Sequence, residues 1–231
     1  PKMQVYYAIT KDKFQGRDNI KLVIENPKTN ETIRSTTMAL DASRLKIISP
    51  RNEVVFDPEE PEQLFIIFNT INTRLYQVVM RLHYMEVDPK YPENCIYKHV
   101  DYELQEVIED GTGKIHIDYN LVGFLASLSN GISRTTELER YWADDLEILI
   151  NTANEDFLAY QQSTSSDFSI IQYRKAYNNI DNGYGLFACR ASKTKILPYE
   201  SIAKRGMMNI EGLNFKGSIN DYNFIGGIPE N

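Results

Sequence analysis

The sequence predicts a mainly β fold, a β-sandwich into which two or three short helices are inserted. Two observations support this fold class. The 231 residues include 15 Tyr and 10 Phe, and aromatic rings pack well on the pleated surface of a sheet. In the first third of the chain, turn signals recur about every 8–12 residues, a spacing typical of β-sandwiches.

Three segments near the start alternate in polarity or are rich in β-branched residues, as strands are. They are Met3–Ile9, Ile20–Ile24 and Thr32–Met38. Turn-like sequences separate them, among them Lys13–Asp18 and Asn26–Asn30. Because Gly, Pro, Asn and Asp favour turns, we expect short strands joined by tight connections here.

The clearest strand prediction is Leu75–Val87, where alternation with a period of two residues persists for ten residues. One face is apolar and is formed by Tyr76, Val78, Met80, Leu82 and Tyr84. The opposite face carries Gln77, Arg81 and His83. Flanking strands are predicted at Leu64–Phe68 and Cys95–Val107, and a hairpin-type turn is predicted at Glu109–Gly113.

Two helices are predicted in the second half. In Asn120–Ser129 the apolar positions repeat with helical spacing; they are Leu121, Phe124, Leu125 and Leu128. Asn154 is a suitable N-cap for a short helix that ends near Tyr160. We also expect a short turn of helix within Thr135–Tyr141.

The remaining segments are predicted as strands or extended chain. The strands are Asp145–Ile150, Phe168–Tyr173 and Leu186–Leu197, and Gln161–Asp167 is predicted as a polar loop. From Gly206 on, the sequence is rich in Gly and Asn and is expected to be extended. We therefore divide the chain into an N-terminal β segment (1–46), a main domain of β and α+β character (47–215) and an extended tail (216–231).

Charge and cysteine content limit the possible functions. The net charge is -7, whereas nucleic-acid binding needs a cationic surface; the basic stretch Arg190–Lys195 is short. No run approaches the ~18 apolar residues of a membrane span. Cys95 and Cys189 lie far apart in the sequence and form either one disulfide or two buried thiols. We expect no nucleic-acid partner.

The segment Gly183–Ala188 has the spacing G-x-G-x-x-A of a dinucleotide-binding turn. A functional turn of this kind follows a buried strand and opens a helix. Here Lys175–Asn182 is not a buried strand, and Cys189–Ile196 has no amphipathic pattern. We predict a structural turn instead, in which Asn182, Gly183 and Gly185 tolerate positive φ angles. No cofactor is expected.

No other group of residues predicts a catalytic or metal-binding site. The spacing from Asn178 to Gly183 resembles a calcium loop, but Ile180 occupies a ligand position. His83, His99 and His116 have no metal-ligand spacing, and the pairs Asp144-Asp145 and Glu59-Glu60 lie in polar contexts. We therefore expect a protein that is not an enzyme and holds no metal.

The tyrosines suggest a further possibility, because not all of them can point inward. An aromatic surface that binds a partner is one interpretation. Its candidate residues are Tyr6, Tyr7, Tyr97, Tyr102, Tyr173 and Tyr177.

The segment Ser163–Lys195 resembles part of a family of uncharacterised Bacteroidota outer-membrane lipoproteins, in which a Ser/Thr-rich loop and a strand lead to Y-x-N-I-x-N-G-x-G-I-F-S-S-R. The matching residues are Ile171-Gln172, Tyr177, Asn179-Ile180, Asn182-Gly183, Gly185-Leu186-Phe187 and Arg190. Upstream similarities are Ile48–Pro50, Tyr76–Tyr84 and Glu155–Tyr160. The resemblance extends from about Ile47 to Phe215.

This resemblance implies an exported protein with an Ig-like β-sandwich, lipid-anchored at an N-terminal cysteine and associated with TonB-dependent transporters or other outer-membrane barrels. It implies no enzymatic activity. The chain departs from the family because it has no N-terminal cysteine or lipobox. The expected function is that of an accessory or scaffold lipoprotein that binds a barrel protein or a peptide or glycan ligand.

Two alternatives remain open at this point. A virion structural protein, such as a tail or capsid accessory component, would also be rich in β structure and tyrosine, and a Met-Pro start would explain Pro1. An enzyme that uses the Gly183–Gly185 turn would bind a nucleotide, and Gly185→Val would weaken that binding.

Overall fold

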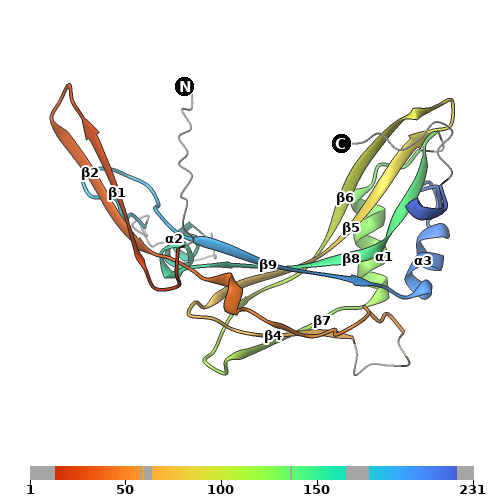
Figure 1. Cartoon of the computed structure of the whole chain (residues 1–231), viewed down its shortest axis with the longest axis horizontal. Helices are drawn as coiled ribbons and strands as arrows, with labels where there is room; N and C mark the ends of the chain where they lie inside the picture. Colours follow the sequence, from red (N-terminus) through yellow and green to blue (C-terminus); the bar gives the residue numbers. More distant parts are fainter. Residues whose placement is uncertain (1–13, 58, 60–63, 136, 165–176, 223–231) are drawn as a thin grey trace, which may run out of the picture. The chain divides into compact units, whose positions relative to one another are not determined.

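The computed structural model describes residues 14–57, 59, 64–135, 137–164 and 177–222 (Figure 1). The chain forms two compact units. The small unit comprises Pro1–Asp41 and Ala153–Ala191, and the large unit comprises Ala42–Thr152 and Ser192–Asn231. The predicted division at residues 46/47 and 215/216 stays a prediction.

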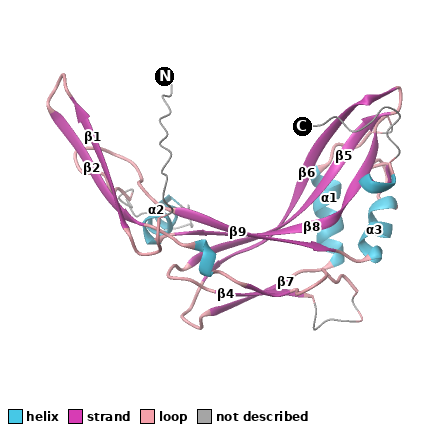
Figure 2. Cartoon of the chain, viewed as in Figure 1, coloured by secondary structure: helices cyan, strands magenta, loops and turns pink. Residues whose placement is uncertain are grey.

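The predicted mainly β fold with a few helices is confirmed, with 48% of the described residues in strands and 18% in helices. Figure 2 shows strands in both units. None of the described helices is long and apolar enough to span a membrane.

The large unit contains two sheets. The first has the strand order β10-β8-β5-β6, with β9 also paired to β8. Its strands are β5 (Leu75–Asp88), β6 (Tyr91–Ile108), β8 (Glu139–Ala153), β9 (Arg190–Pro198) and β10 (Phe215–Ser218). The second sheet has the order β3-β4-β7. Its strands are β3 (Ile47–Ser49), β4 (Phe65–Asn69) and β7 (Lys114–Asp118).

Strand β5 has neighbours on both edges, and its predicted apolar face is buried. Tyr76, Met80 and Leu82 are fully buried, whereas His83 on the opposite face is exposed. The two sheets pack against each other, because the ring of Phe68 in β4 lies 5.4 Å from that of Tyr76. This face of the sheet therefore forms the core of the large unit.

Helix α1 (Leu121–Gly131) begins where the sequence predicts it. The Asn120 side chain accepts a hydrogen bond of 2.7 Å from the Gly123 N–H, as an N-cap does. Phe124 and Leu128 are buried, and the Phe124 ring lies 4.9 Å from that of Phe56. The apolar stripe of α1 thus joins the core beside the two sheets.

The prediction of an extended chain from Gly206 on is wrong. Helix α3 (Ser201–Met208) includes Gly206, and β10 and a 3-10 turn, η3 (Ile219–Asp221), follow. A Cβ atom at Gly206 would lie 2.7 Å from Cδ1 of Leu125 in α1. Glycine here indicates close packing of the two helices, which a single sequence does not reveal.

Three further predictions in the large unit need correction. The Thr135–Tyr141 segment contains no described turn of helix, because β8 begins at Glu139. The Glu109–Gly113 turn joins β6 to β7, which lie in different sheets, so it does not close a hairpin. The strand predicted from Leu186 begins only at Arg190.

The small unit is built on an antiparallel hairpin and one helix. Strands β1 (Asn19–Asn26) and β2 (Glu31–Met38) pair along their whole length, which confirms the strands predicted there. Helix α2 (Glu155–Thr164) follows the predicted cap Asn154 and extends into the predicted polar loop. The strands predicted at Met3–Ile9 and Phe168–Tyr173 lie outside the described residues.

Candidate functional site

The segment with the G-x-G-x-x-A spacing forms a loop in the small unit, residues 177–187, which we call the Asn-framed loop. It precedes β9 and lies beside β2. The side-chain amides of Asn178 and Asn179 hold its backbone, and that of Asn182 bonds to Thr32 of β2. The conformation of the loop therefore rests on hydrogen bonds from particular side chains.

Asn178 bonds to the loop across its width. Its Oδ1 atom accepts from the N–H groups of Gly185, at 2.9 Å, and Ile180, at 3.4 Å. Its Nδ2 atom donates to the carbonyl oxygens of Ile180 and Gly183, each at 3.1 Å. One amide side chain thus takes the place of the backbone partners that a regular strand would supply.

Asn179 makes a paired contact with one residue. Its Nδ2 atom donates to the carbonyl oxygen of Phe187 at 2.8 Å, and its Oδ1 atom accepts from the Phe187 N–H at 2.9 Å. The two bonds fix the end of the loop relative to its start. Because both backbone groups of Phe187 are satisfied, this half-buried segment needs no neighbouring strand.

The loop is also attached to strand β2. Arg34 and Asp181 exchange two backbone hydrogen bonds, of 3.3 and 2.8 Å. The Asn182 side chain donates to the carbonyl oxygen of Thr32 at 3.1 Å. The Ser35 hydroxyl of β2 donates to the carbonyl oxygen of Asn179 at 2.6 Å. These four bonds anchor the loop along the strand.

The three predicted turn residues have different roles. Asn182 and Gly185 have φ angles of 57° and 139°, in the left-handed region that favours Asn and Gly. Gly183 is not in that region; a Cβ atom there would lie 2.9 Å from Cγ2 of Ile180. Position 183 therefore requires glycine for space rather than for backbone conformation.

The loop presents one large side chain to solvent. Tyr184, between Gly183 and Gly185, is 98% exposed, the highest value among the described large hydrophobic residues. The sequence analysis did not single it out. A Tyr flanked by two glycines near Asn residues could have indicated it, because that composition combines a tight turn with a side chain that has little to pack on.

The geometry of the loop differs from that of a phosphate site at a helix N-terminus. Such a site uses free backbone N–H groups at the start of a helix, whereas Gly185 and Phe187 donate theirs to Asn178 and Asn179. The residues after the glycines lead into strand β9. Two N–H groups of the G-x-G-x-x-A segment are thus engaged within the loop.

A cluster of polar side chains supports the loop from within the same unit. Asp156 of α2 accepts hydrogen bonds of 2.7 Å from the hydroxyl groups of Tyr177 and Thr37. Burial and the adjacent Asp156 carboxylate raise the pKa of Tyr177 to about 12. The Tyr177 hydroxyl therefore stays protonated and donates at neutral pH.

Asn154 completes this cluster. It is 2% exposed, and its Nδ2 atom donates to the Thr37 hydroxyl at 2.5 Å and to the carbonyl oxygen of Met38 at 3.1 Å. Its Oδ1 atom accepts from the Phe157 N–H at 3.4 Å, so the same residue caps α2 as predicted. Asn154 therefore connects α2 to β2.

The other residues considered from the sequence do not assemble into a reactive site among the described residues. His83 is half exposed and lies 2.9 Å from a Glu147 carboxylate oxygen. In the described part of the chain, no group of three or more His, Cys, Asp or Glu residues is placed to hold a metal ion. Cys95 and Cys189 are half-buried free thiols.

The predicted tyrosine surface is only partly visible. Tyr97 is 56% exposed on β6, but Tyr102 and Tyr177 are half buried. Tyr6, Tyr7 and Tyr173 lie outside the described residues. Among the described exposed tyrosines, which are Tyr91, Tyr97, Tyr160 and Tyr184, Tyr97 alone belongs to the group proposed from the sequence.

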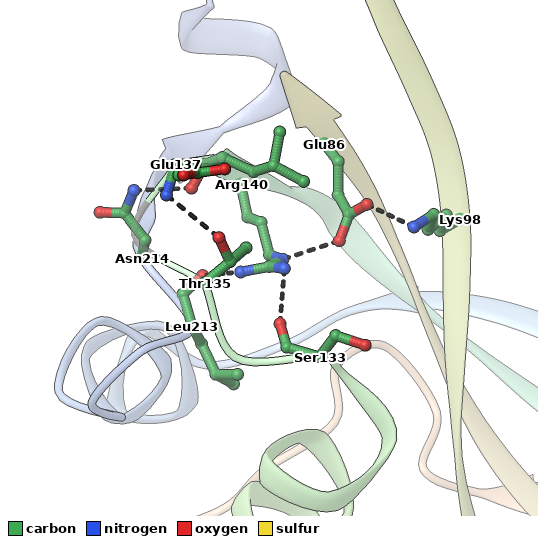
Figure 3. A network of polar contacts seen from close by, with 9 residues as sticks. Glu86, Lys98, Ser133, Thr135, Glu137, Arg140, Leu213 and Asn214 are labelled. Carbon is green, nitrogen blue, oxygen red and sulfur yellow. Dashed lines mark hydrogen bonds and ion pairs between the residues drawn. The ribbon is translucent and has the colours of Figure 1, made fainter. Parts of the chain in front are cut away.

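In the large unit, the sequence analysis missed a buried charged network (Figure 3). Arg140 of β8 has no exposed surface, and its guanidinium donates to Glu86 Oε1 at 2.9 Å. It also donates to the carbonyl oxygens of Leu213, at 2.6 Å, and Ser133, at 2.8 Å. Arg140 thus joins two loops to β5, which is a structural role.

Lys98 of β6 pairs with the other oxygen of Glu86. Burial tends to raise the pKa of Glu86, but hydrogen bonds from Lys98 and Arg140 outweigh burial and lower that pKa below its usual value. The carboxylate is therefore charged at neutral pH and balances the buried cation.

Comparisons with protein-family models, curated proteins and solved structures found no match for this chain. The resemblance to Bacteroidota lipoproteins thus stays a prediction from the sequence. The candidate site is defined by the geometry of the Asn-framed loop.

Proposed function

We propose that this chain is a non-enzymatic accessory or scaffold lipoprotein of a Bacteroidota outer-membrane assembly. In this role it binds an outer-membrane β-barrel protein, or a peptide or glycan ligand, and is held at the membrane by an N-terminal lipid anchor. The resemblance of Ser163–Lys195 to such lipoproteins supports the assignment.

The observation that carries the proposal is the pre-organised Asn-framed loop with its exposed Tyr184. The amides of Asn178 and Asn179 hold the loop backbone through six hydrogen bonds to four residues. Because ordering a mobile loop on binding costs free energy, a loop that is already ordered loses less. Tyr is enriched in interfaces because its ring is apolar and its hydroxyl forms hydrogen bonds.

The test is purification of the native protein from its own cells in a mild detergent, followed by mass spectrometry of the bound proteins and of the N-terminus. We expect a β-barrel protein in near-equal amount and an acylated N-terminus. A parallel purification from cells that lack the gene identifies non-specific proteins. An unmodified protein that elutes alone would contradict the proposal.

A further inference from the structure

We infer that Tyr184 is the anchor of the interface, and that its partner is a protein with an apolar pocket into which the phenol ring inserts. This inference rests on the proposed function and deepens it. It specifies a protein rather than a glycan as the partner, and it names Tyr184 as the side chain that binds this partner.

The shape of the loop points to a concave partner. Tyr184 is 98% exposed, so its ring projects from the loop and lines no cleft. Sites for small ligands and sugars are concave, and a few convergent polar groups orient the ligand. A projecting ring instead fits a cavity on the surface that it meets, as buried aromatic anchors do at the centre of protein interfaces.

The polar groups of the loop make a glycan a poor match. Recognition of a sugar needs hydrogen-bond donors and acceptors that are free to meet its hydroxyl groups. Here Asn178 and Asn179 use both their amide nitrogen and oxygen atoms within the loop. Asn182 donates to Thr32. The large apolar side chain that the loop offers outward is the ring of Tyr184 with its hydroxyl group.

Charge adds a second property of the partner. Asp181 is exposed in the same loop, three residues before Tyr184, and the whole chain carries a net charge of -7. A pocket with basic residues at its rim would complement both, and complementary charges accelerate association. The inferred partner site thus has apolar walls, a hydrogen-bonding group for the phenol and a cationic rim.

The first part of the test is photo-crosslinking in the protein's own cells. Tyr184 is replaced by p-benzoylphenylalanine in one variant, and Tyr160, a partly exposed tyrosine of α2 in the same unit, in a control variant. We expect crosslinks from position 184 to apolar residues of one site on one protein, and few from position 160. Crosslinks from position 184 to glycan or lipid alone would overturn the inference.

The second part measures affinity with the purified protein that was crosslinked. Tyr184→Ala should weaken binding by about 30-fold or more, and Tyr184→Phe by about threefold to tenfold. Tyr160→Ala should change binding less than about twofold, as expected for a side chain outside the interface. Asn179→Ala should also weaken binding, because the Asn179 amide bonds to Phe187 within the loop and the loop loses order without it.

The two proposals fail differently. If the wild-type chain elutes alone and its N-terminus is unmodified, the proposed function is wrong. If a protein co-purifies equally well with wild type and with Tyr184→Ala, the proposed function stands and the inference about Tyr184 is overturned.

Discussion

In the large unit, apolar side chains from two sheets and from α1 and α3 form one continuous cluster, and the described members of that cluster all belong to this unit. In the small unit, several of the least exposed described side chains are polar: Ser35, Thr37 and Asn154. The interior of the large unit is thus filled mainly by apolar side chains. In the described part of the small unit, these buried polar side chains join segments by hydrogen bonds.

The difference follows from size. A small unit buries a smaller share of its surface, so the hydrophobic effect contributes less to its stability. Hydrogen bonds each contribute only about 1 kcal/mol net, but they are directional. The described small unit therefore has its conformation fixed by individual side chains, and a single substitution there should change local structure more than it changes global stability.

The largest effect is expected in the large unit, from Arg140→Met. The change leaves Glu86 with Lys98 alone and removes the donors to Leu213 and Ser133. Breaking a buried ion pair costs about 3–5 kcal/mol, which urea denaturation would measure. The control is Arg81→Met on the exposed face of the same sheet, where the Asp101 pair contributes about 1 kcal/mol or less. Equal costs for the two variants would contradict the structural role of Arg140.

The next largest effect is expected from Glu86→Gln. This substitution should lower the free energy of unfolding by about 1.5–3 kcal/mol at pH 7, the range for hydrogen bonds to charged groups. Because the folded-state pKa of Glu86 is lowered, its contribution is fully present above the unfolded pKa of about 4.3 and is lost as pH falls through the folded pKa. The stability difference between wild type and variant should therefore narrow below about pH 4.3. Denaturation curves at several pH values that show a constant difference would contradict this assignment.

In the small unit, Asn154→Ala should cost about 1–3 kcal/mol locally, because it removes the cap of α2 and two buried hydrogen bonds. Hydrogen exchange of the α2 amides would measure the loss, with the large unit unchanged. Asn154→Asp serves as the matched variant, since it keeps the acceptor for Phe157 but loses the donors to Thr37 and Met38. An Asp variant as protected as wild type would show that the cap alone matters.

The smallest effect is expected from Gly183→Ala, at about 1 kcal/mol, because the new Cβ atom would lie 2.9 Å from Ile180 Cγ2. Hydrogen exchange at Phe187 would report the loosened loop. The control is Gly217→Ala in β10, where no heavy atom lies within 4 Å of the added carbon. If both variants behave alike, steric space at position 183 does not explain the glycine.

Sequence periodicity determined regular elements with a long apolar face, whereas α3 and β10 were not predicted. The alternation in Leu75–Val87 and the helical spacing from Leu121 to Leu128 correspond to β5 and α1, because burial of one face dictates where apolar residues recur. Asn154 was predicted as a cap, because a cap acts on neighbours in the sequence. These features depend on residues that are close along the chain.

Tertiary structure decided the features that depend on distant residues. Strands β6 and β7 are consecutive in the sequence but lie in different sheets. The close approach of Leu125 to Gly206 explains a glycine within α3. The Arg140 network joins residues more than 50 positions apart, and the Asn-framed loop reaches β2 across about 150 positions. No local pattern encodes which distant carbonyl or carboxylate a side chain will meet, because chain folding alone brings those groups together.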